Sequence, residues 1–225
     1  MTNIILQHYT GQLGELEKES VINMTAYAQS VGAHYQLVTG QVFDSNFTTP
    51  IQKIYMLDKA WDTYDTVVML DIDMFATINT TENVFNVPGV GLHEATQARL
   101  HKQLARTYPN ISSINTPYWG GAIYKLDRET RQRLRRPLED GDVQWMQQYN
   151  RRYHWGDEGI MHTLAMKTGY NPIQPYMDKK WCQCSFLPHP ENAGFIHIRT
   201  KVKPSGPKRD KIDNLRALQQ QGIIA

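Results

Sequence analysis

The sequence has little cysteine and no long apolar run. Its two cysteines, Cys182 and Cys184, are separated by one residue, so a disulfide between them would close a very small, strained ring. Buried structural thiols are favoured over a zinc half-site with His189, because no second pair of ligands stands at a usual spacing. The apolar run at residues 67–70 is far shorter than the roughly 20 residues that span a bilayer.

The first residues lack the basic start and the long apolar segment of a secretory signal. Together with the short apolar runs, this predicts a soluble, cytoplasmic protein without an integral membrane segment. The 40% of hydrophobic residues is enough for a full core, so the fold needs neither disulfides nor a metal to hold it together.

The chain also lacks an excess of charge of one sign. It has 24 lysine and arginine residues against 22 aspartate and glutamate residues, which gives no global field for a polyanion and argues against nucleic-acid binding. Basic residues gather locally near the C-terminal end, at Arg199, Lys201, Lys203, Lys208, Arg209 and Lys211. Such a small patch fits a phosphate or diphosphate, although a solvated basic tail has the same composition.

Strands and helices are predicted to alternate through the first half of the chain. The expected strands are 3–9, 33–38 and 66–70, and the expected helices are 15–30 and 51–64. Further strands are expected at 90–92 and 122–124, and further helices at 96–107, 128–135, 158–168 and 212–221. This order predicts an α/β fold with a mainly parallel, Rossmann-like sheet flanked by helices. One catalytic domain is expected over 1–205, with a tail helix or linker over 206–225.

Two carboxylates follow the most apolar strand. Residues i and i+2 of an extended chain point to the same side, so Asp71 and Asp73 can converge on one cation. They stand at the carboxyl end of a central strand, where open α/β sheets bind their ligands. Oxygen ligands of this kind favour Mg²⁺ or Mn²⁺.

Three other segments carry residues that could complete such a site. The imidazole of His197 could be a further ligand and Lys203 could neutralise a diphosphate, although an ordinary strand histidine fits the pattern as well. Gly120 and Gly121 allow a ligand close to the backbone, or make a plain turn. The adjacent acids Asp157 and Glu158 open a helix, where Asp157 could also act as a cap.

These residues together resemble the GT-A fold of nucleotide-sugar glycosyltransferases, and especially glycosyltransferase family 8. Asp71-Ile-Asp73 matches the Asp-x-Asp motif of the family, which implies binding of Mn²⁺ and of the donor diphosphate. His197, followed six residues later by Lys203-Pro204, resembles the family's His-x5-Lys-Pro, which implies a third metal ligand and a phosphate-binding lysine.

The resemblance also implies roles for other residues. Asp157-Glu158 stands where the family has an Asp-Gln pair at the donor sugar. Asn115 and Trp119-Gly120-Gly121 fall in the segment that lines the sugar pocket, and Lys53 lies near a basic donor-binding residue. The nucleobase and ribose are expected at His8, Tyr9 and Thr10. The chain departs from the family where Glu158 replaces Gln and where the first strand lacks Asp-x-Asn-Tyr.

The expected activity is transfer of a sugar from a UDP-sugar to an acceptor hydroxyl on a glycan, with Mn²⁺ or Mg²⁺ held by Asp71, Asp73 and His197. Lys203, helped by Lys201 or Arg199, would add positive charge at the diphosphate. The His-x5-Lys-Pro match favours retention of configuration, with Asp157 and Glu158 holding the sugar. In an inverting enzyme one of those two acids would be the base.

Two other functions fit the same motifs. A phosphohydrolase of the haloacid dehalogenase type would use Asp71 as its nucleophile. A non-catalytic module would bind the nucleotide or carbohydrate in this pocket without turnover.

Overall fold

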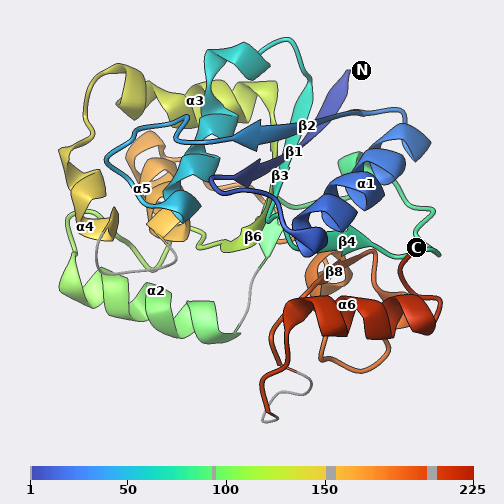
Figure 1. Cartoon of the computed structure of the whole chain (residues 1–225). Helices are drawn as coiled ribbons and strands as arrows, with labels where there is room; N and C mark the ends of the chain where they lie inside the picture. The colour runs from blue at the N-terminus through green and yellow to red at the C-terminus, as the bar shows by residue number, and fades with distance from the viewer. Residues whose placement is uncertain (1, 93–94, 151–155, 202–206) are drawn as a thin grey trace.

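A computed structural model describes residues 2–92, 95–150, 156–201 and 207–225 (Figure 1). Its central sheet has the strand order β2-β1-β3-β6-β5. The strands are β1 (Asn3–Tyr9), β2 (His34–Thr39), β3 (Thr66–Leu70), β5 (Gly91–Leu92) and β6 (Gly120–Asp127). β1 pairs in parallel with β2 and β3, whereas β6 pairs antiparallel with both β3 and β5. The prediction of an α/β fold with a mainly parallel sheet is therefore confirmed.

Helices cover both faces of this sheet (Figure 1). The α-helices are α1 (Glu15–Ser30), α2 (Ala95–Thr107), α3 (Arg128–Glu139), α4 (Gln147–Asn150), α5 (Gly156–Thr168) and α6 (Lys211–Gln220). Alternate residues of β3 enter different cores: Val67 and Met69 pack with α3 and α5, whereas Val68 and Leu70 pack with α1. Burial on both faces explains why β3 is a continuous apolar run.

The segment predicted as a helix over 51–64 is instead made of two 3₁₀ turns, η1 (Thr49–Leu57) and η2 (Lys59–Trp61). Asp58 interrupts the helix because its backbone is extended, and its carboxylate accepts a hydrogen bond from the Ala60 amide at 2.8 Å. The η1 turn is still deeply buried and carries Lys53 toward the sheet. Shorter 3₁₀ turns are η3 (Val84–Asn86), η4 (Gln144–Met146), η5 (Lys179–Cys182) and η6 (Pro190–Asn192).

A second, smaller sheet was not predicted. It has the order β4-β8-β7, with β4 (Met74–Ala76), β7 (Gln183–Cys184) and β8 (Phe195–His197). β4 and β8 are antiparallel, and Met74 is the partner of His197 in their register. Since β4 begins one residue after Asp73, this pairing brings two distant parts of the chain to one place.

The C-terminal helix packs onto this second sheet and onto α1. Leu215 and Leu218 of α6 share a buried cluster with Leu16 of α1 and with Ile196 and Ile198 at β8. The boundary after residue 205 stays a prediction, but α6 is anchored in a core that it shares with the rest of the fold. Within the described residues, no helix is both long and apolar enough to cross a membrane.

Candidate active site

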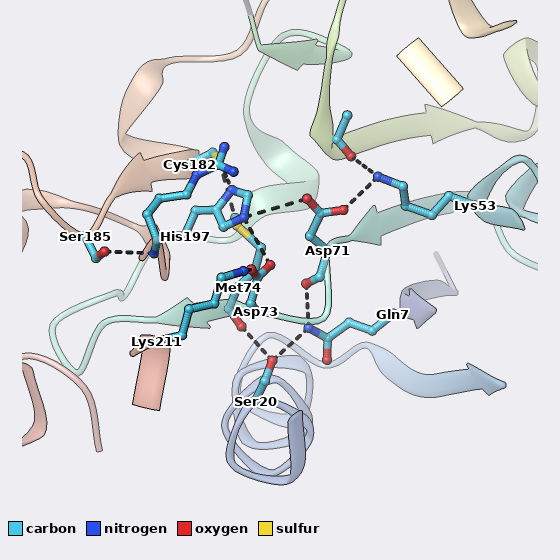
Figure 2. A network of polar contacts seen from close by, with 12 residues as sticks. Gln7, Ser20, Lys53, Asp71, Asp73, Met74, Cys182, Ser185, His197 and Lys211 are labelled. Atoms are coloured by element: carbon cyan, nitrogen blue, oxygen red, sulfur yellow. Dashed lines mark hydrogen bonds and ion pairs between the residues drawn. The ribbon is translucent and has the colours of Figure 1, made fainter. Parts of the chain in front are cut away.

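The turn that carries Asp71 and Asp73 is fixed by buried polar side chains (Figure 2). The Gln7 amide donates to the Asp71 carbonyl and to the Ser20 hydroxyl, both at 2.9 Å. The Ser20 hydroxyl in turn donates to the Met74 carbonyl at 2.8 Å. Gln7 and Ser20 are fully buried, so the turn is clamped from β1 and α1. The sequence analysis missed both residues, because a single polar residue in an apolar strand or helix carries no motif.

Asp71, Asp73 and His197 converge at the carboxyl end of β3, as predicted. One ligand atom from each lies within 4.8 Å of the others. His197 Nε2 is 3.0 Å from Asp73 Oδ1 and 3.8 Å from Asp71 Oδ2. Its Nδ1 is 3.8 Å from the thiol sulfur of Cys182, so the Nε2 atom is the one turned to the carboxylates. Two carboxylates and one imidazole are a donor set that fits Mn²⁺ or Mg²⁺.

Lys211 is a third residue that the sequence analysis did not place at the metal site. Its ammonium makes an ion pair with Asp73 Oδ2, on the oxygen that does not face His197 (Figure 2). Burial of the Asp73 carboxyl favours its neutral form, but its contacts with His197 and Lys211 outweigh this and lower its pKa. The many basic residues at 199–211 indicated that positive charge lies near the site. Composition alone does not show which lysine contacts the carboxylates.

Lys53 joins the two acidic motifs. Its ammonium is 2.7 Å from Asp71 Oδ1, 2.8 Å from Asp157 Oδ2 and 2.7 Å from the Gly121 carbonyl oxygen. The side chain is buried, which disfavours its charge, yet the two carboxylates raise its pKa above the ordinary value. The sequence analysis expected Lys53 at the donor; in the structure the partners of its ammonium are protein oxygens, and a role at the donor stays a prediction.

Asp157 and Glu158 open α5 directly beneath the start of β6. The Tyr124 hydroxyl donates to Asp157 Oδ2 at 3.2 Å, and the Gly121 amide donates to Glu158 Oε1 at 2.9 Å. Burial raises the pKa of Asp157, and the adjacent Lys53 opposes that shift. A Cβ on Gly121 would lie 2.5 Å from Asp157 Oδ2, so only glycine lets the acids approach β6 this closely.

The residues expected at the nucleobase lie at the end of β1. The His8 ring is buried, and its Nε2 is 2.7 Å from the Gly40 carbonyl oxygen. Burial lowers the pKa of His8, which favours the neutral ring. Tyr9 and Thr10 are partly exposed, and the Thr10 hydroxyl lies 3.0 Å from that of Thr49.

The residues expected at the sugar pocket and the diphosphate are spread more widely. Trp119 is fully buried and donates from Nε1 to the Pro175 carbonyl at 2.7 Å, so its ring belongs to the core. Asn115 is exposed at a surface pocket beside Tyr118. Lys201 is exposed, and Lys203 lies outside the described residues.

The fold is similar to those of solved structures, although the comparisons by sequence found no match. No family model and no curated protein sequence matches this chain. A glycosyltransferase involved in glycosylation of the major capsid of PBCV-1 superposes with a TM-score of 0.58 at 10% identity, covering 97% of this chain and 100% of that one. The galactosyltransferase LgtC, solved with donor and acceptor sugar analogues, gives a TM-score of 0.59 at 9% identity, covering 98% and 95%.

This chain has the GT-A fold. A structure of an active-site mutant of LgtC gives the same result, with a TM-score of 0.56 at 10% identity over 97% of this chain and 95% of that one. The likeness therefore runs over nearly the whole chain. The GT-A fold predicted from the Asp-x-Asp turn and its surroundings is confirmed.

Proposed function

We propose that this protein is a metal-dependent glycosyltransferase that moves a sugar from a UDP-sugar to an acceptor hydroxyl on a glycan. The observation that carries the proposal is the convergence of Asp71, Asp73 and His197 at the carboxyl end of β3 in a GT-A fold. This edge is where open α/β sheets bind their ligands. A cytoplasmic location remains a prediction.

Different residues of the chain are proposed to bind the metal, the diphosphate, the sugar and the uridine of the donor. Asp71, Asp73 and His197 would hold Mn²⁺ or Mg²⁺, which supplies Lewis-acid stabilisation of the departing diphosphate. Arg199, Lys201 and Lys203 are proposed to add positive charge at that diphosphate. The backbone of Gly120 and Gly121 is proposed to border the sugar together with Asn115, while His8, Tyr9 and Thr10 hold the uridine.

The contacts of Asp157 support retention of configuration. Its side chain is 3% exposed, and Oδ2 is held by Lys53 at 2.8 Å and by the Tyr124 hydroxyl at 3.2 Å. A general base must be within hydrogen-bond reach of the acceptor hydroxyl, which a carboxylate enclosed in this way does not offer. We therefore assign Asp157 to holding Glu158 and β6 in place, and Glu158 to the donor sugar.

The proposal is tested by incubating the protein with a panel of UDP-sugars and Mn²⁺ and measuring release of UDP with and without glycan acceptors. Acceptor-dependent release is expected from at least one donor. The anomeric configuration of the product, followed by NMR from the first minutes, should be that of the donor. An inverted product would overturn retention of configuration and would make Glu158 the candidate base.

The two other functions give different results in the same assays. A phosphohydrolase would turn over a chromogenic phosphate ester with Mg²⁺ and lose that activity in Asp71→Asn. A non-catalytic module would bind UDP with Mn²⁺, yet release no UDP from any donor. The glycosyltransferase structures reported above favour transfer over phosphate hydrolysis.

A further inference from the structure

Lys211 is placed at the metal site by an element outside the predicted motifs. It is the first residue of α6, where the Asp210 carboxylate accepts a hydrogen bond from the Ile212 amide at 3.1 Å and caps the helix. Leu215 and Leu218 fix the helix in the core. The backbone of Lys211 is therefore held in place, while its long side chain reaches Asp73. The two residues are 138 positions apart in the sequence.

Lys211 differs from Lys53 in the freedom of its charged end. Lys53 is buried and bonds three protein oxygens. The Lys211 side chain is 34% exposed, whereas the Asp73 carboxylate that it meets is 10% exposed. Figure 2 shows the partly exposed Lys211 side chain meeting the more deeply buried Asp73 carboxylate. A lysine on a flexible stem can move to another anion and stay solvated, provided that another cation takes its place at the buried carboxylate.

We propose that Lys211 is an exchangeable counter-ion: it neutralises Asp73 in the metal-free protein and transfers to the donor diphosphate once the metal is bound. This inference rests on the proposed function. Asp73 is a predicted metal ligand, and Lys211 occupies one oxygen of its carboxylate, so the ammonium and a divalent cation compete for the same carboxylate. Two cations at that carboxylate repel each other, and a diphosphate is the negatively charged partner that the displaced ammonium would meet.

Lys211→Met keeps the apolar stem of the side chain and removes its charge. The proposal predicts that this variant binds Mn²⁺ more tightly but UDP more weakly than the wild type. Mn²⁺ alone should bind the variant more tightly, by about tenfold, because no ammonium has to be displaced. UDP should bind the Mn²⁺-saturated variant more weakly, by about tenfold, which is at the low end for loss of a hydrogen bond between charged groups. UMP should be affected less than UDP, and Lys211→Arg should restore UDP binding.

Both arms are measured by titration calorimetry on the full chain, with Lys208→Met as the matched control. Lys208 is exposed and lies in the same basic stretch, so its loss tests the net charge of that stretch without touching Asp73. The control should leave both affinities close to those of the wild type. Melting temperatures measured without metal show whether α6 stays docked in each variant.

Weaker binding of both Mn²⁺ and UDP in Lys211→Met, or no change in either, would overturn the proposal. The first result would mean that Lys211 only supports the shape of the site. Wild-type protein that binds Mn²⁺ but no UDP would defeat the proposed function and the transfer to a diphosphate. The Mn²⁺ arm would then still decide whether Lys211 competes for Asp73.

Discussion

Two acidic pairs lie near the carboxyl end of β3: Lys53 bridges them through Asp157 and Asp71, and Lys211 pairs with Asp73. In the closed pair, Asp157 and Glu158, the Asp157 carboxylate is enclosed by Lys53 and Tyr124 at 3% exposure. In the open pair, Asp71 and Asp73, the carboxylates are 28% and 10% exposed. The two pairs have the same chemistry but different surroundings.

The difference separates the structural role proposed for Asp157 from the metal-binding role proposed for Asp71 and Asp73. A buried ion pair fixes the geometry of its neighbours, and losing one partner leaves an uncompensated charge. A carboxylate at the edge of the site, facing an imidazole and an exchangeable ammonium, can instead take a cation from solution. Substitutions at Lys53, His162 and Gly121 test the surroundings of the closed pair, and a substitution at Asp73 tests the open pair.

The largest effect is expected from Lys53→Met. The substitution leaves Asp71 and Asp157 without the cation between them, which should lower the free energy of unfolding by about 3–5 kcal/mol. Urea denaturation followed by circular dichroism measures this. Lys59→Met is the matched control, because Lys59 pairs with Glu139 on the surface at 73% exposure and should change stability by less than about 1 kcal/mol. If the two variants lower the free energy of unfolding equally, the buried ion pairs of Lys53 matter no more for stability than the exposed pair of Lys59.

The helix of the closed pair also buries His162, which makes stability depend on pH. Its Nε2 is 2.8 Å from the Ser112 hydroxyl and its Nδ1 is 2.9 Å from the Pro117 carbonyl oxygen. Burial lowers the pKa of His162 to about 4, and the nearby His101 acts in the same direction. The unfolded chain then binds the extra proton between about pH 6.5 and 4, so stability is full above that window and falls as the pH drops through it.

This one ring should account for a loss of about 3 kcal/mol across the window. In His162→Gln the pH dependence of unfolding should be flatter by that amount, as measured by urea denaturation at several pH values. A variant whose stability follows the same slope as the wild type would show that folding does not lower the pKa of His162.

Asp73→Asn breaks the open pair. Loss of a ligand carboxylate should weaken Mn²⁺ binding by at least about 100-fold, beyond what outer-shell changes usually cause, and should abolish Mn²⁺-dependent UDP binding. Stability should change less than in Lys53→Met, because the exposed ammonium of Lys211 is solvated when its partner is lost. Calorimetry measures binding, and Asp142→Asn, at an exposed pair with Lys167, serves as the control. Unchanged Mn²⁺ affinity would refute the metal assignment.

The smallest effect is expected from Gly121→Ala. The added methyl group meets Asp157 Oδ2, which Lys53 and Tyr124 hold in place, so stability should fall by about 1–3 kcal/mol. Gly14→Ala is the control: its Cβ would meet Glu17 Oε2 at 2.8 Å, but that carboxylate is the far end of a flexible, partly exposed side chain. If both variants lower the free energy of unfolding by the same amount, the Asp157 carboxylate is not held in a fixed position.

The first half of the fold could be predicted because its signals are local. Apolar runs at β1 and β3 and the helical spacing of α1 each identify an element from its own residues. The 3₁₀ turns at 49–61 could not be predicted, since apolar spacing does not show that the Asp58 backbone is extended. The second sheet was missed because its strands are two or three residues long and pair only through distant contacts.

The sequence by itself determined that two carboxylates end a strand buried on both faces, because the apolar run and the i, i+2 spacing are properties of neighbouring residues. Its resemblance to the GT-A fold also singled out His197. Only the tertiary structure decided which lysine neutralises which acid. An ion pair requires two charges within about 4 Å, and the positions of η1 and α6, which set that distance, depend on packing between segments far apart in the chain.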